Sequence, residues 1–202
     1  MSTPDRPRVR PTDACLVLLS ISEGAVRLLV IEPSPGSSRN EVNPKMTELV
    51  SRRGEYIRAS ATDVWRALTD PDMTEQYLGG ARIQSTWRPG DEITYLAPDG
   101  VTRLLEGKLL EVIPNRRLVF ECKLLFDPRF AAEKPHRETF EIEDLGNVCL
   151  LTATFDQYQP DSLSYAFACD SRGGMDLTGS SLKSLLETGS PIKLAVEPSA
   201  KS

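Results

Sequence analysis

The sequence contains a single histidine, His136, and only four cysteines, none of them in a Cys-x-x-Cys pair. A zinc site usually shows Cys or His ligands at short, repeated spacing, so this pattern predicts no metal site. Widely spaced cysteines are typical of reduced thiols, and we expect a cytoplasmic protein. No run of 18 apolar residues is present, so no transmembrane helix and no membrane partner are expected.

Positive charge is also scarce, since 24 Lys and Arg face 29 Asp and Glu and give a net charge of -5. Proteins that bind nucleic acids hold the phosphates with clustered basic residues, so we expect no nucleic-acid partner. Three arginines precede the apolar residues 15–21, which imitates a signal peptide. However, Asp13 lies at the boundary and no small-residue cleavage site follows before Glu23, so we predict none.

The 202 residues, 40% of them hydrophobic, suffice for one domain with a tail. Residues 1–45 stand apart because they hold six of the 15 prolines. Two β-prone runs within them, 16–21 and 26–31, flank a Glu-Gly pair and predict a hairpin, followed by a linker. We expect residues 1–45 to be a peripheral or poorly ordered extension. The alternative is that Met46 is the natural start and the extension is an over-extended reading frame.

Residues 46–190 have the pattern of one α+β domain. Residues 49–59 predict a strand, Ser60 with Asp63 predicts a helix N-terminus, and Pro71 ends that helix. A second short helix is predicted from Asp72 to the glycines at 79–80. Turn residues then separate six antiparallel strand-like segments, at 82–87, 92–96, 103–113, 118–126, 136–143 and 148–155.

The final element is a long amphipathic helix between about residues 161 and 188, with apolar positions three and four residues apart. The glycines at 173–174 weaken it, so we predict a break there or a helix that starts only after them. Gly189 and Pro191 end the helix, and residues 191–202 are a C-terminal tail.

Three segments carry a resemblance to a known family: residues 59–71, 107–120 and 180–189. They resemble the opening strand-to-helix segment, the central hairpin and the closing helix of the activator of heat-shock-protein ATPase homologue (AHSA-like) family, in the START-like (SRPBCC) superfamily. The resemblance spans about residues 47–190. It implies a helix-grip fold, in which a curved antiparallel sheet wraps around a long C-terminal helix and two short helices follow the first strand.

Two positions depart from the family pattern. Gly173-Gly174-Met175 stands where the family usually has Gly-Gly-Trp, and Gln76-Tyr77-Leu78 stands where it often has a tryptophan pair. Both changes remove indoles from positions expected to border a cavity. The ligand is therefore expected to differ from that of close relatives.

A helix-grip fold leaves a cavity between sheet and helix that suits an apolar or amphipathic small molecule. Strand alternation and helical spacing predict the residues that line it: Phe120, Leu124, Phe140, Phe167, Met175 and Leu182. Methionine at 175 removes volume relative to tryptophan and adapts to irregular space, which favours a void.

Four further residues are candidates for ligand contact. His136 and Glu138 fall on the inward face of their strand and would form a polar anchor or an acid/base pair at the cavity mouth. The alternative is a strand end that frays into solvent. Trp87 is a candidate cover for the cavity rim, and Tyr95 could offer its hydroxyl to a ligand, with core packing as the alternative.

These observations favour a binding protein for a hydrophobic small molecule, without cofactor and without catalytic residues. A cyclase- or hydrolase-type enzyme of the same fold is one alternative, although the single histidine and the lack of Gly-x-Ser-x-Gly count against it. The other is a co-chaperone-like protein that binds a heat-shock ATPase, as the family name implies. An enclosed pocket with converging polar groups would favour binding or catalysis, and an exposed apolar patch would favour a protein partner.

Overall fold

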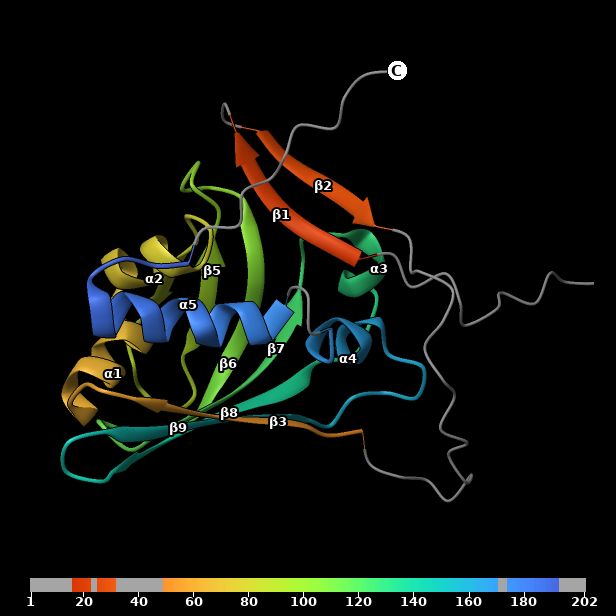
Figure 1. Ribbon diagram of the computed structural model, residues 1–202. Helices are drawn as coiled ribbons and strands as arrows, with labels where there is room; N and C mark the ends of the chain where they lie inside the picture. Colours follow the sequence, from red (N-terminus) through yellow and green to blue (C-terminus); the bar gives the residue numbers. More distant parts are fainter. Residues whose placement is uncertain (1–15, 23–24, 32–48, 171–173, 193–202) are drawn as a thin grey trace, which may run out of the picture.

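The computed structural model describes residues 16–22, 25–31, 49–170 and 174–192. A curved antiparallel sheet of seven strands forms the main body, in the order β3-β9-β8-β7-β6-β5-β4. Its strands are β3 (Ser51–Ile57), β4 (Arg82–Ser85), β5 (Glu92–Leu96), β6 (Arg103–Ile113), β7 (Arg117–Leu124), β8 (His136–Asp144) and β9 (Cys149–Asp156). Helix α5 (Gly174–Thr188) lies across the inner side of this sheet (Figure 1). The predicted helix-grip architecture is confirmed.

Two short helices follow β3, as predicted: α1 (Ala61–Thr69) and α2 (Pro71–Tyr77). The Ser60 hydroxyl oxygen accepts a hydrogen bond from the Asp63 N–H at 3.1 Å and so caps α1. Asp70 accepts from the Asp72 N–H at 2.8 Å and caps α2. Helix α2 begins at Pro71 rather than Asp72, because proline is compatible with the first position of a helix.

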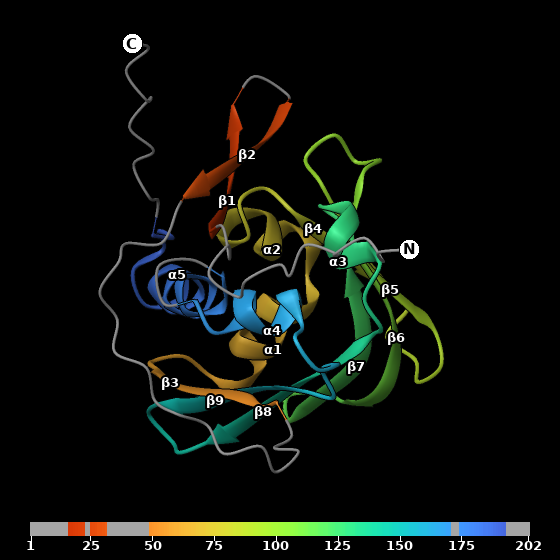
Figure 2. The same cartoon turned by 90° about the vertical axis from the view of Figure 1, so that its right-hand side faces the viewer.

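The predicted break in the long C-terminal helix is present. Helix α4 (Leu163–Ala168) precedes it, α5 begins at Gly174, and residues 171–173 lie outside the described residues. A further short helix, α3 (Pro128–Ala131), follows β7 and was not predicted, since four residues are too few for a helical pattern in the sequence. In Figure 2 helix α5 is seen end-on, with α1, α2 and α4 on the same side of the sheet.

The core lies between the inner face of the sheet and helices α1, α2 and α5. Ile57, Phe120 and Phe155 from the sheet are fully or almost fully buried there together with Leu182 of α5. Arg53 of β3 links this layer to the helices, because its guanidinium donates to the Ala168 carbonyl at 2.6 Å and forms an ion pair with Asp176 of α5. Within the described residues no helix is long and apolar enough to cross a bilayer.

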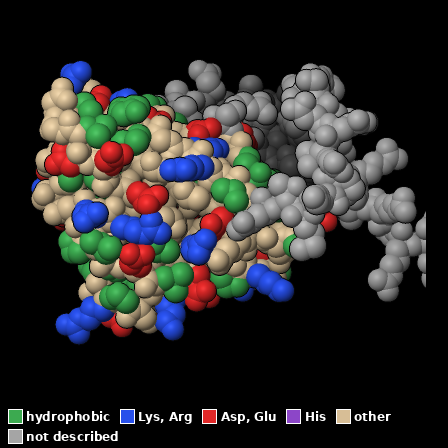
Figure 3. All heavy atoms as spheres, turned by 90° about the horizontal axis from the view of Figure 1, so that it is seen from below, with side chains coloured by type: hydrophobic (Ala, Val, Ile, Leu, Met, Phe, Trp, Pro, Cys, Tyr) green, Lys and Arg blue, Asp and Glu red, His purple; other side chains and the backbone are tan. Residues whose placement is uncertain are grey.

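The outer face of the sheet is polar. Arg137 and Asp156, paired across β8 and β9, form a bidentate ion pair at 2.8 and 2.6 Å. Arg117 of β7 bonds Glu111 at 3.0 Å and also contacts Glu141 of β8. Figure 3 shows the molecule from below, with basic and acidic side chains interspersed on this face. The charges there thus neutralise one another locally.

Strand β6 approaches β7 closely at Gly107, which pairs with Cys122. A Cβ atom at position 107 would lie 2.1 Å from the Glu121 carbonyl oxygen and 2.8 Å from the Cys122 Cβ. Only glycine fits this position without displacing the backbone of β7.

The N-terminal segment forms the predicted hairpin. Strands β1 (Leu16–Ser22) and β2 (Ala25–Ile31) pair antiparallel, with Leu16 opposite Ile31. They form a sheet of two strands and contribute none to the seven-stranded sheet. The rest of residues 1–45, including the predicted linker, lies outside the described residues.

We predict that removal of residues 1–45 leaves a cooperatively folding protein, because the seven strands of the main sheet and the core residues that the structure describes all lie after residue 50. The check is thermal unfolding of a chain that starts at Met46, followed by circular dichroism. Insolubility or a broad, non-cooperative transition would show instead that residues 16–31 complete the core.

Gly107→Ala should lower the free energy of unfolding by about 2–4 kcal/mol, because the new methyl group collides with backbone atoms of β7. Urea unfolding measures the change. Gly54→Ala is the matched control in strand β3, where a Cβ would meet only the Leu150 Cδ1 at 3.4 Å. Equal stabilities for the two variants would contradict the close approach.

Candidate functional site

Three polar side chains meet on the inner face of the sheet where β7 pairs with β8. Cys122 lies directly opposite His136, and Glu138 follows two residues later on the same face. Only 1%, 4% and 6% of Cys122, His136 and Glu138 remain exposed. Strand β8 begins at His136, so the alternative of a frayed, solvated strand end is wrong.

The three side chains contact one another through single atoms. His136 Nε2 lies 3.2 Å from Glu138 Oε1, and Cys122 Sγ lies 3.4 Å from the same oxygen. The distance from Cys122 Sγ to His136 Nε2 is 3.6 Å. We call Cys122, His136 and Glu138 the polar cluster.

Aromatic rings surround the polar cluster. The Tyr158 ring, between β9 and α4, stacks on the His136 ring with centroids 4.7 Å apart and planes 15° apart. Tyr165 of α4 packs edge-on against Tyr158 at 5.4 Å. Tyr95 extends from the inner face of β5 toward the core, half-buried. The cluster is thereby enclosed in a mainly aromatic environment of low polarity.

The electrostatics of the site disfavour negative charge. Burial raises the pKa of the Cys122 thiol, and the neighbouring Glu138 raises it further. Burial likewise raises the pKa of Tyr158, with a contribution from Glu138. The pKa of Tyr95 is raised by burial first and then by Tyr77, Glu138 and Cys122. Cys122 is therefore a protonated thiol at neutral pH, which is unlike an activated nucleophile.

Helix α4, which carries Tyr165 and Phe167, is held by a buried acid from a distant loop. Glu133 accepts hydrogen bonds from the Ser162 hydroxyl at 2.9 Å, the Leu163 N–H at 2.5 Å and the Ser164 N–H at 3.1 Å. These N–H groups at the first turn have no partner within the helix, so the carboxylate satisfies them. Glu133 thus fixes the position of α4 beside the polar cluster.

Phe167 belongs to an aromatic group distinct from the sheet phenylalanines. Its ring lies 5.6 Å from that of Phe126 and 6.0 Å from that of Phe130, and Phe126 and Phe130 are 4.9 Å apart. The three rings join the end of β7, α3 and α4. Phe126 also packs beside Tyr95 and Leu78 against a small apolar cluster.

The other predicted ligand residues divide between the packed core and its margin. Phe120 and Phe140 stack at 6.0 Å in the core that also contains Leu182. Leu124, Tyr95 and Trp87 are half-buried at its margin, and Trp87 adopts a positive φ of 60°. The side chain of Met175 lies outside the described residues.

Cys122 is the member of the cluster that sequence reasoning did not connect with His136 and Glu138. Metal ligands are recognised in a sequence by their close spacing, whereas Cys122 and His136 are 14 residues apart. Strand alternation puts Cys122 on the same face as Phe120 and Leu124, both of which were predicted to line the cavity. The missing information was the register of β7 against β8.

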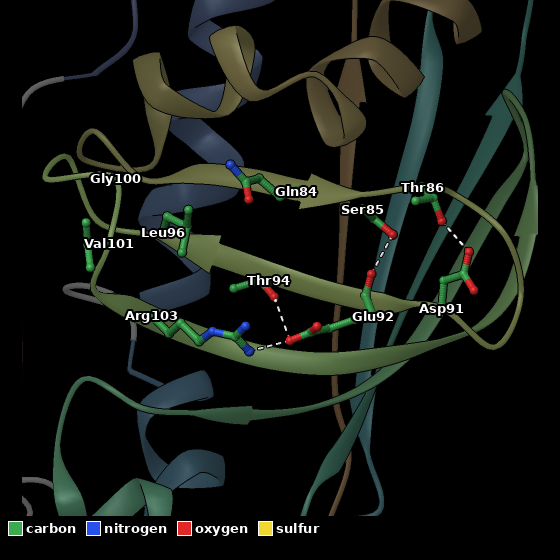
Figure 4. A pocket seen from close by; sticks show the side chains of 10 residues that line it. All are labelled: Gln84, Ser85, Thr86, Asp91, Glu92, Thr94, Leu96, Gly100, Val101 and Arg103. Atoms are coloured by element: carbon green, nitrogen blue, oxygen red, sulfur yellow. Dashed lines mark hydrogen bonds and ion pairs between the residues drawn. The ribbon is translucent and has the colours of Figure 1, made fainter.

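A shallow groove of about 790 Å³ lies elsewhere, on the outer side of β4, β5 and β6 (Figure 4). Its polar groups are bonded mainly to one another: the Ser85 hydroxyl donates to the Glu92 carbonyl at 2.7 Å, and Arg103 forms an ion pair with the Glu92 side chain. Val101 at its margin is 80% exposed. Because its polar side chains are already paired in solvent, this groove is a weaker candidate than the polar cluster.

The antiparallel sheet closed over α5, with a polar cluster inside, defines a helix-grip domain of the START-like (SRPBCC) superfamily. Residues 58–187 match the family model described as Activator of Hsp90 ATPase homolog 1-like protein, and the chain belongs to this family. Among curated proteins, none shows significant sequence similarity to the chain.

Solved structures share the fold at low sequence identity. Protein Ms6760 from Mycobacterium smegmatis is 17% identical, with a TM-score of 0.57 over 74% of this chain and 97% of its own. The Aha1 dimer from Colwellia psychrerythraea is 19% identical, with a TM-score of 0.53 over 71% and 98%. Protein NE0264 from Nitrosomonas europaea is 19% identical, with a TM-score of 0.52 over 69% and 95%. At these identities the likeness establishes the fold alone.

The raised pKa of Tyr95 predicts a specific alkaline instability. A tyrosine in the unfolded chain has a pKa of about 10. The contribution of the neutral Tyr95 side chain to the free energy of unfolding is therefore complete below that pH and is lost as the pH rises above it. Above about pH 10 the free energy of unfolding of the wild type should fall with rising pH. Tyr95→Phe should make this fall less steep by about 1.4 kcal/mol per pH unit. Urea unfolding between about pH 9 and 11 measures the slope. Tyr56→Phe, at a tyrosine that is 59% exposed, is the control, and equal slopes in both variants would refute the assignment.

Proposed function

We propose that the protein binds a hydrophobic or amphipathic small molecule at the end of the sheet–helix interface that contains the polar cluster. The observation that carries the proposal is the cluster itself, in which a thiol, an imidazole and a carboxylate converge inside an aromatic environment. Buried polar groups of this kind are costly for stability and are typical of ligand sites.

Packing indicates which part of the predicted lining is available to a ligand. Phe120 and Leu182 expose 0% and 2% of their surface, so neighbouring side chains already fill the space around them. Leu124 and Phe126 lie at the margins of the apolar clusters, Phe167 packs against Phe126, and all three side chains stay partly exposed. We therefore expect the apolar part of a ligand to contact these residues, with its polar end toward His136 and Glu138.

The enzyme alternative has less support. A cysteine next to a histidine resembles a nucleophile–base pair, but a reactive cysteine needs a lowered pKa. The pKa of Cys122 is raised by burial and by Glu138. We therefore retain binding as the proposed function and expect no catalytic residue.

A heat-shock ATPase partner remains the second alternative, since the family is named for activators of such an ATPase. The large apolar side chains exposed in the described part of the chain come from separate elements, among them Tyr56 of β3, Leu110 of β6 and Ile192 after α5. This scatter gives a protein partner less support than the enclosed cluster gives a small molecule. The free thiols of Cys122, Cys149 and Cys169 are compatible with the cytoplasmic location that we propose.

Leu124→Trp should weaken binding of the neutral apolar dye Nile red at least about tenfold, because the larger side chain fills the proposed space, and tenfold corresponds to about 1.4 kcal/mol. Fluorescence titration of the full chain measures the affinity. Leu110→Trp, on the exposed outer side of β6, is the matched control and should bind the dye like the wild type. Equal dye affinities in the two folded variants would place the ligand elsewhere. Native mass spectrometry of the freshly purified chain tests directly for a co-purified small molecule.

A further inference from the structure

We propose that Cys122, His136 and Glu138 form a binding site for a divalent transition-metal ion of the zinc type, coordinated by Sγ, Nε2 and Oε1. The three atoms converge on one point of the inner sheet face, and all three residues are buried. This inference deepens the function proposed above by assigning a cation to the same site. Metal uptake is measured without any organic ligand, so the two proposals can fail separately.

The distances match those of a tetrahedral site. Zinc lies about 2.3 Å from a thiolate sulfur and about 2.0–2.2 Å from an imidazole nitrogen or a carboxylate oxygen. In a tetrahedral site, the nitrogen and oxygen ligands are then about 3.4 Å apart, and the sulfur lies about 3.5–3.6 Å from each of them. The observed separations are 3.2 Å for N–O, 3.4 Å for S–O and 3.6 Å for S–N. The three atoms therefore form one face of a tetrahedron without rearrangement of the strands.

The charge of the site also calls for a cation. Among the described residues, the buried Glu138 carboxylate contacts His136 and Cys122, and neither side chain carries a permanent positive charge. A buried carboxylate without a fixed cation is costly. When a metal ion M²⁺ binds, the Cys122 S–H bond breaks, an S–M bond forms and the proton leaves to solvent. The two resulting negative charges, thiolate and carboxylate, then balance the ion.

The ligand set selects the kind of metal. Thiolate and imidazole favour zinc, cobalt and similar ions, whereas calcium and magnesium prefer oxygen ligands. Tyr158 stacks on the imidazole and so holds the ring that presents Nε2 to the site. Three protein ligands leave the fourth tetrahedral position for water or for a polar group of the bound small molecule.

The test is cobalt and zinc titration of the full chain, produced without a polyhistidine tag, reduced and treated with a chelator. We expect one equivalent of Co²⁺ to give the intense near-ultraviolet band of thiolate-to-cobalt charge transfer, and Zn²⁺ but not Ca²⁺ to displace it. Cys122→Ala should abolish the band. Loss of a residue that only supports a metal ligand weakens metal affinity by about 10- to 100-fold. His136→Gln and Glu138→Gln remove ligands themselves and should weaken it by more than this.

The cysteine controls are Cys149→Ala, a buried thiol that donates to the Ala59 carbonyl outside the cluster, and Cys169→Ala, an exposed thiol. Both should keep the band. Less than half an equivalent of bound metal in the wild type, or a band that survives Cys122→Ala, would overturn the proposal.

A measurement on the wild type covers the case in which a cluster variant does not fold. X-ray absorption of the zinc-loaded protein should show one sulfur at about 2.3 Å and two or more nitrogen or oxygen neighbours at about 2.0–2.2 Å. A first shell without sulfur, or with several sulfur atoms, would refute the site. Nile red affinity is measured with and without zinc, so loss of metal binding alone leaves the small-molecule proposal intact.

Discussion

The pairing of β7 with β8 is the constraint on which the candidate site depends. Side chains alternate between the two faces of a strand, so one register places Cys122 opposite His136, and Phe120 opposite Glu138, on the inner face. A shift of one residue would move the polar cluster to the solvent side and bring charged residues into the core. The outer face supports the same register, because Arg117 of β7 contacts its partner Glu141 of β8. The inner polar cluster and the outer contact between Arg117 and Glu141 are thus two consequences of one alignment.

The aromatic cover of the cluster depends on contacts that are distant in sequence. The N-terminus of α4 is satisfied by Glu133, and its C-terminal carbonyl at Ala168 accepts from Arg53 of the edge strand β3. Six residues form too short a helix to be stable alone, so these two charged side chains determine where α4 lies. Tyr165 and Phe167 are presented from that position, and Tyr158 is held between α4 and the His136 ring.

A buried thiol, imidazole and carboxylate make this part of the core less stable than an apolar filling would. Elsewhere in the core, Phe120, Phe140 and Leu182 pack through apolar contacts. A buried imidazole and carboxylate in direct contact are therefore better explained by binding than by stability. This contrast separates the polar cluster from the outer groove at β4–β6, where polar side chains are paired in solvent at little cost.

The sequence by itself determined the features that depend on neighbours along the chain. Ser60 with Asp63 marked the start of α1, turn residues separated the strands predicted at 92–96 and 103–113, and strand alternation correctly placed His136 and Glu138 on the inner face. Only the tertiary structure decided that Cys122 meets His136, that Glu133 caps a helix 30 residues later, and that Phe167 joins Phe126 rather than Phe120. The physical reason is that local patterns fix the face of each side chain, whereas strand register and helix docking are set by packing and hydrogen bonds between segments far apart in the chain.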